Sequence, residues 1–225
     1  MMRRLVWFGL PGLGILGLVA AFSVAGAASA PTPSLRYHAI VPAVVRGEDP
    51  TPPPSPPPYD GPVASLYLAS AGIDSSAPVE QRGTLWEGGH EVFADPSAPG
   101  NIAWYSDSRF GHPGFGGQNS VFAAHINYMN YGNGPFARLT SAEPGSALYV
   151  TMDNGDSYAY TVAYVTLVPL AVLNSGGMDA IVFPALDAHT ERITLISCGG
   201  DFVPNPGGGG EYTSRVVLVA ERYVP

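Results

Sequence analysis

The chain contains no lysine, and all ten of its positively charged residues are arginines. This absence excludes every reaction that needs a lysine amine, including P-loop phosphate binding, the serine–lysine dyad, the protein-kinase lysine and Schiff-base catalysis. Charged residues make up only 12% of the chain, and the net charge of −8 has the wrong sign for binding a nucleic-acid backbone. We therefore expect no nucleic-acid partner.

Cysteine is equally scarce, because Cys198 is the single cysteine among 225 residues. One cysteine cannot form an internal disulfide framework. The length suits one domain with appendages, and a hydrophobic content of 46% is sufficient for a buried core. The sequence thus predicts one folded domain that is stabilised without disulfides.

The N-terminal segment, residues 1–30, has the features of an export signal. Arg3 and Arg4 are followed by an apolar stretch without charge, residues 5–30. The stretch is long enough to span a bilayer, which requires about 20 residues, whereas residues 28–30, Ala-Ser-Ala, resemble a cleavage site. We favour an uncleaved membrane anchor over a removed signal peptide, because signal-peptide apolar regions are usually about 7–15 residues long. Either alternative places the rest of the chain outside the membrane.

A proline-rich linker, residues 31–62, follows this segment. Seven of the nine residues from Pro50 to Pro58 are proline. Such a run adopts polyproline II and acts as a semi-rigid spacer of about 3.1 Å per residue. The alternative is a ligand for proline-recognition domains, which are mainly intracellular, so we favour an extracellular stalk.

The globular part, residues 63–225, contains short β-branched and aromatic runs separated by glycine and proline. Strands are predicted over residues 66–69, 120–124, 147–151, 158–162, 192–196 and 215–219. Asn154-Gly155 lies between two of these runs and is typical of a two-residue type I′ hairpin turn. Long amphipathic helices are absent, and residues 136–139 could form one helical turn. The pattern predicts an all-β fold, an antiparallel sandwich or a closed barrel.

Two of these runs end in residues that could carry chemistry. Cys198 ends an apolar run and precedes two glycines, and His125 ends another apolar run. A thiol needs a partner to be a useful nucleophile, since its free pKa is about 8.5. Most free cysteines are simply small buried hydrophobic residues, and that alternative stays open here. The other four histidines, His38, His90, His112 and His189, are interpreted as surface residues.

Arg215 opens the last predicted strand. It could be a solvated surface residue, or it could donate to a developing oxyanion. Metal signals are poor. The motif that begins at His90-Glu91 lacks the second histidine of a zinc helix, and Tyr164 stands where a calcium loop beginning at Asp153 needs a glutamate. We therefore expect no metal and no cofactor.

Together these three residues give the C-terminal domain a resemblance to the sortases, a family of cell-surface cysteine transpeptidases. Residues 194–198, Thr-Leu-Ile-Ser-Cys, resemble the family's Thr-Leu-x-Thr-Cys strand end. Residues 121–125, Val-Phe-Ala-Ala-His, resemble its strand ending in Ala-Gly-His, and residues 212–217 resemble its arginine-bearing final strand. The resemblance covers about residues 66–223. Two small residues depart from the pattern: Ala124 replaces glycine and Ser197 replaces threonine.

The resemblance implies a closed eight-stranded barrel with short helical turns, and an N-terminal anchor in a bacterial membrane. It implies that Cys198 attacks the Thr–Gly bond of a Leu-Pro-x-Thr-Gly-like sorting signal on an exported protein. His125 would protonate the leaving amine, and Arg215 would stabilise the oxyanion. A peptidoglycan or pilin amine, or water, would then accept the acyl group. The residues expected to form the wall of the substrate pocket flank these three: Ala123, Ser197 and Tyr212.

Two alternatives of different kinds remain open. One is another thiol enzyme, either a hydrolase or a cell-wall transpeptidase; the L,D-transpeptidases carry an arginine two residues after their cysteine, where this chain has Gly200. The other is a non-catalytic β-barrel displayed on a stalk for binding. That alternative predicts a fully buried Cys198 with His125 elsewhere.

Overall fold

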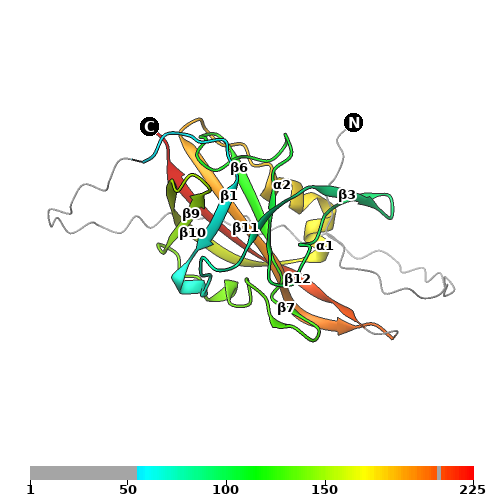
Figure 1. The fold of residues 1–225 in the computed structure, drawn as a ribbon. Helices are drawn as coiled ribbons and strands as arrows, with labels where there is room; N and C mark the ends of the chain where they lie inside the picture. The colour runs from blue at the N-terminus through cyan, green and yellow to red at the C-terminus, as the bar shows by residue number, and fades with distance from the viewer. Residues whose placement is uncertain (1–54, 207–208) are drawn as a thin grey trace. The chain divides into compact units, whose positions relative to one another are not determined.

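The structure is a computed structural model that describes residues 55–206 and 209–225. Within these ranges the chain is mostly β-structure with short helical segments (Figure 1). The strands are β1 (Val63–Tyr67), β2 (Val79–Arg82), β3 (Thr84–Glu87), β4 (His90–Phe93), β5 (Ile102–Tyr105), β6 (Asn119–Ala123), β7 (Asn127–Tyr128), β8 (Gly132–Asn133), β9 (Ala147–Met152), β10 (Ser157–Pro169), β11 (Thr190–Pro204) and β12 (Gly210–Tyr223). The helical segments are η1 (Ala69–Ala71), η2 (Leu139–Ser141), α1 (Leu170–Val172), the π-helical η3 (Leu173–Gly177) and α2 (Met178–Val182).

Eight of the strands form one sheet in the order β1-β9-β10-β12-β11-β6-β5-β2. Its two end strands, β1 and β2, approach each other, so the sheet is a nearly closed barrel. The predicted all-β fold with an eight-stranded barrel and short helical turns is confirmed. The sequence did not predict that β11 pairs with β6, and β2 with β5, in parallel.

The alternation of side chains along the strands produces two apolar clusters. One fills the barrel and includes Trp104, Phe122 and Leu195. Their chain neighbours point to the opposite face, because successive strand residues alternate between faces. On that face a second cluster joins the strands to the helical segment of residues 170–182; its members include Tyr105, Ala123, Ile196, Leu173 and Met178. The long strands β11 and β12 run side by side and project beyond the barrel near β7 (Figure 1).

The turn between β9 and β10 differs from the prediction. Asn154 and Gly155 do lie in it, but the strands are joined by residues 153–156, and of the two only Gly155 has a positive φ, of 90°. A type I′ turn requires positive φ at both central residues, so the two-residue type I′ prediction is wrong. The amide of Asn154 instead binds Asp156, accepting from its main-chain N–H at 2.9 Å and donating to its carboxylate. This side-chain contact stabilises the longer turn.

The first 54 residues lie outside the described residues, and so do the predicted anchor and most of the predicted linker. The last residues of that linker contact the barrel. Tyr59 packs against the core, the carbonyl of Pro57 accepts a hydrogen bond from Tyr158 at 2.8 Å, and Ser55 accepts one from Arg222. No helix within residues 55–206 and 209–225 is long and apolar enough to cross a membrane.

A buried ion pair connects three parts of the barrel. Glu191, with no exposed surface, accepts hydrogen bonds from the N–H of Gly114, from Tyr160 and from the Nε of Arg222. The Arg222 guanidinium also lies 4.6 Å from the ring centre of Tyr158. A buried carboxylate that loses its cation is left without compensation for its lost hydration, so each member of this group depends on the others.

We predict that Arg222→Gln lowers the free energy of unfolding by about 3 kcal/mol, because it leaves the charge of Glu191 buried. The measurement is urea denaturation of the full chain. The matched control is Arg192→Gln, which breaks the more exposed Arg192–Glu221 pair of the same sheet and should cost at most about 1 kcal/mol. Equal losses in the two variants would contradict the role assigned to the buried pair.

Candidate active site

Strand register brings the three predicted catalytic residues to one end of the sheet. Cys198 on β11 lies directly opposite Arg215 on β12. On the other side of β11, Ile196 pairs with Ala123 of β6, and the N–H of Ala124 continues the pairing by donating to the carbonyl of Ile196 at 3.3 Å. Because these two strands are parallel, His125 and Cys198 each lie two residues beyond the Ile196–Ala123 pair. The thiol and guanidinium therefore come from the adjacent strands β11 and β12, and the imidazole from the residue two positions after the end of β6.

The three side chains belong to the outer face of the barrel wall. Two-residue alternation places His125 on the face of Ala123 and Cys198 on the face of Ile196, and both of those residues belong to the cluster beneath the helical segment. Cys198 and His125 are each half-buried. The binding-module alternative required a fully buried thiol, and the half-buried Cys198 does not fit it.

The two glycines that follow Cys198 allow the strands to stay close. A Cβ at Gly199 would lie 2.7 Å from side-chain atoms of Leu167 and Val216. Gly200 has a φ of 78°, a left-handed conformation that favours glycine, and a Cβ there would lie 2.7 Å from the hydroxyl of Thr213. The β11–β12 register shifts just after this point. Any larger residue at either position would therefore force the neighbouring strands or the backbone beside the thiol to move.

Arg215 is almost completely buried, with 1% exposure. Its Nη1 donates to the carbonyls of Tyr212 at 3.1 Å and Ser214 at 2.9 Å, and its Nη2 donates to the carboxylate of Glu211 at 3.3 Å. The guanidinium is therefore held by its own strand. Its charge lies beside Cys198 in a region of low dielectric, where electrostatic interactions are stronger than in water.

Burial and charge act in opposite directions on the two reactive groups. Burial raises the pKa of Cys198 above that of an ordinary thiol; the positive charge of Arg215 lowers it, while Asp95 and Glu211 raise it further. Burial lowers the pKa of His125, and the negative charge of Asp95 raises it. Both shifts from burial favour the neutral thiol and imidazole, because removing a charge from water is costly.

Sequence reasoning missed the acidic member of this group, Asp95. Its carboxylate interacts electrostatically with Cys198, His125 and Arg215. Asp95 ends the run Val92-Phe93-Ala94 just after β4, as His125 and Cys198 end theirs. A polar residue at the end of an apolar run was the available signal. The sequence could not show that this end lies beside the other two.

Two further contacts link the histidine side of the site to the arginine side. The ring of Tyr128 lies 5.1 Å from that of His125, between ring centres. Asn127 donates a hydrogen bond of 2.7 Å to the hydroxyl of Tyr212, whose carbonyl binds Arg215. The hairpin of β7 and β8 is thereby joined to β12 across the open end of the site.

The predicted pocket-wall residues differ in their exposure. Tyr212 is half-buried and participates in the bridge just described. Ala123 is 1% exposed and Ser197 has no exposed surface. Ser197 lies on the barrel-interior face of β11, by alternation with Cys198, and its hydroxyl has no hydrogen-bond partner among the described residues. Contact of Ala123, Ser197 and Tyr212 with a substrate stays a prediction.

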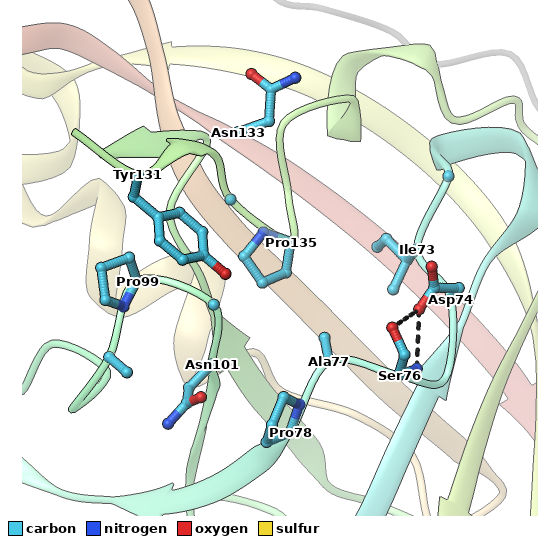
Figure 2. Close-up of a pocket in the computed structure, with 14 residues that line it drawn as sticks. Ile73, Asp74, Ser76, Ala77, Pro78, Pro99, Asn101, Tyr131, Asn133 and Pro135 are labelled. Carbon is cyan, nitrogen blue, oxygen red and sulfur yellow. Dashed lines mark hydrogen bonds between the residues drawn. The ribbon is translucent and has the colours of Figure 1, made fainter. Parts of the chain in front are cut away.

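A separate pocket of about 470 Å³ lies beside the segment that follows His125 (Figure 2). Tyr131, Pro99 and Pro135 line one part of it, and Asp74, which accepts hydrogen bonds from Ser76, lines another. One of its lining residues, Gly134, packs directly against the carbonyl of His125. The catalytic candidates themselves do not line the pocket, so it adjoins the site without containing it.

A mostly β barrel that carries a thiol, an imidazole and a guanidinium near adjacent strand ends has the groups that thiol acyl transfer or thiol-dependent hydrolysis requires. The model of the Sortase domain matches residues 71–223, more than half of the chain. The chain therefore belongs to the sortase family, whose members are cysteine transpeptidases. No curated protein sequence matches the chain.

Several solved sortase structures match the chain. Sortase C2 of Pilus Island 1 from group B Streptococcus is 17% identical, with a TM-score of 0.47, and the match covers 71% of this chain and 72% of that one. Sortase C-1 from Actinomyces oris is 18% identical over the same shares of the two chains, also with a TM-score of 0.47. A lid mutant of sortase A from Corynebacterium diphtheriae is 18% identical, with a TM-score of 0.46 and coverage of 72% and 70%.

The charges around Cys198 predict opposite effects of two substitutions on its titration. Arg215→Ala should move the titration of the thiol to higher pH, because it removes the cation that lowers the pKa. Glu211→Gln should move it to lower pH, because it removes an anion that raises the pKa. The measurement is the rate of iodoacetamide alkylation against pH, which reports on Cys198 alone because it is the single cysteine.

Arg192→Ala is the matched control for loss of a positive charge, since Arg192 lies on β11 six positions before Cys198 and binds Glu221. It should leave the titration of the thiol unchanged. Shifts in the same direction for Arg215→Ala and Glu211→Gln would contradict the electrostatic account of the site.

Proposed function

We propose that the chain is a transpeptidase that cleaves the Thr–Gly bond of a Leu-Pro-x-Thr-Gly-like sorting signal and transfers the acyl group to an amine. The observation that carries the proposal is the strand register that brings Cys198, His125 and Arg215 together in a chain that matches the Sortase domain. The substrates are exported proteins that carry the signal. The acceptor is an amine of peptidoglycan or of a pilin.

In the first half of the reaction, the thiolate of Cys198 attacks the threonine carbonyl and a carbon–sulfur bond forms. The carbon–nitrogen bond breaks as the imidazolium of His125 gives its proton to the departing glycine amine, because an amine anion is not a viable leaving group. The product is a thioester on Cys198. In the second half, the acceptor amine gives a proton to His125, attacks the thioester and releases the thiolate.

Arg215 supports both halves through its charge. A guanidinium that is fixed beside Cys198 stabilises the thiolate and the negative oxygen that develops during attack. Its hydrogen bonds to the carbonyls of Tyr212 and Ser214 hold it in place before substrate binds. Such preorganised charge avoids reorganisation at the moment of reaction.

The proposal includes a location. Residues 1–30 would anchor the chain in a bacterial membrane with its N-terminus in the cytoplasm, or would be removed to give a secreted protein. Residues 31–62 would hold the barrel away from the membrane surface. This arrangement would place the thiol where exported proteins pass.

We predict that Cys198→Ala abolishes turnover and that His125→Gln lowers kcat/KM by at least about a hundredfold, because general acid catalysis contributes about 10² to 10⁴ in rate. The measurement is cleavage of a sorting-signal peptide library by the full chain, with mass spectrometry of the Cys198 thioester and of its products with and without an added amine. Products in which the amine replaces glycine indicate transfer, and free acid indicates hydrolysis.

The control for the histidine substitution is His189→Gln. His189 is exposed, and its ring contacts the carbonyl of Val224. This variant should retain wild-type turnover. A fully active Cys198→Ala variant would overturn the proposal.

A further inference from the structure

Three chain segments contribute to one packed cluster, and each ends in a polar residue just beyond it. Phe93, Ala123 and Ile196 belong to the same apolar cluster. The ring centres of Phe93 and Tyr105 lie 4.4 Å apart. Tyr105 pairs with Val121 of β6, two residues before Ala123. Two residues beyond each of the three clustered residues lie Asp95, His125 and Cys198, in that order. All three polar groups therefore follow residues of one cluster, and the carboxylate of Asp95 interacts electrostatically with both His125 and Cys198.

The backbone around Asp95 is fixed by its own contacts. The Nε of Arg82 donates to the carbonyl of Asp95 at 2.9 Å. The hydroxyl of buried Tyr105 donates to the carbonyl of Ala94 at 2.9 Å, and the N–H of Ala94 donates to Gly83 at 3.0 Å. These hydrogen bonds hold the main chain of residues 94 and 95, which lie between β4 and β5, and so restrict where the carboxylate of Asp95 can lie.

The charged and titratable groups that interact with this carboxylate come from six neighbouring elements. They are Arg82 at the end of β2, Glu87 at the end of β3, Tyr105 at the end of β5, His125 after β6, Cys198 on β11 and Arg215 on β12. Burial raises the pKa of Asp95, and the three basic side chains oppose that shift. Among the charges that act on His125, Asp95 is the one that favours the protonated ring.

We propose that Asp95 is a positioning residue for the transpeptidation reaction: its carboxylate holds the proton on His125 that is given to the leaving amine. This inference rests on the proposed function and adds a fourth group to the three that the family resemblance implied. Burial disfavours the protonated ring of His125, which is the form that acts as an acid. The carboxylate takes no part in the proton transfer, so the only proton that moves in this step is the one on the imidazolium.

The same carboxylate disfavours the thiolate of Cys198, and Arg215 compensates for this effect. The two charges thus act on different groups: the carboxylate of Asp95 stabilises the imidazolium of His125, and the guanidinium of Arg215 stabilises the thiolate of Cys198. The active pair of thiolate and imidazolium needs both charges, because each reactive group is driven toward its neutral form by burial.

The variant Asp95→Asn tests the effect of the carboxylate on His125 and Cys198. In the variant, the titrations of both His125 and Cys198 should move to lower pH, since the carboxylate raises both pKa values. The ring of His125 is followed by NMR in the full chain, with its signal identified from the His125→Gln variant, and the thiol is followed by alkylation. Neither measurement needs a peptide substrate. With a cleaved peptide, the pH optimum should also move down, with roughly a tenfold loss of kcat/KM at the wild-type optimum.

Two variants distinguish charge from structure. Asp95→Glu keeps the carboxylate and should restore most of the wild-type titration of His125. Asp201→Asn removes the same charge from an exposed position of β11 three residues after Cys198, and it should leave both titrations in place. The proposal is overturned if the titration of His125 is unchanged in Asp95→Asn, or if Asp201→Asn moves it equally. If the titrations move as expected but the wild-type chain cleaves no peptide, the result counts against the proposed function and not against the effect of Asp95 on His125.

Discussion

The parallel pairing of β6 with β11 is the constraint on which the candidate site depends. It places Ala123 beside Ile196, and every further residue of either strand then advances in step with its neighbour. His125 and Cys198 reach the same level and the same face for this reason. The antiparallel partner β12 adds Arg215 opposite Cys198. A shift of one residue in either pairing would turn one of the reactive side chains to the barrel interior.

Burial gives this site its geometry and also opposes its chemistry. The apolar cluster beneath the helical segment orders the strand ends, yet the same low dielectric disfavours both the thiolate and the imidazolium. Charged side chains fixed nearby oppose this effect of burial. Their interactions are strong because the same low dielectric that disfavours the charged forms also strengthens electrostatic attraction. The site therefore combines an apolar floor with a small set of charged side chains of both signs.

Much of this arrangement could be predicted from sequence, because it is local. Strands were recognisable from β-branched and aromatic runs, and Cys198, His125 and Arg215 from their places at the ends of those runs. The parallel pairings were not predictable, since each depends on which distant segment lies alongside. Asp95 was missed for that reason. The Asn154-Gly155 turn was predicted in place but not in type, because the side chain of Asn154 stabilises a longer connection.

The burial of Arg215 bears on how it acts. Its Nη1 binds main-chain carbonyls of its own strand, and Nη2 binds Glu211 at the longer distance of 3.3 Å from a residue that is more exposed. The carbonyl contacts fix the guanidinium, whereas the contact with the more exposed Glu211 is longer. Because Tyr212 provides one of those carbonyls and also binds Asn127, the hairpin on the histidine side and the cation are connected through one residue. The hairpin on the histidine side and the guanidinium beside the thiol are thus joined by hydrogen bonds to the same residue.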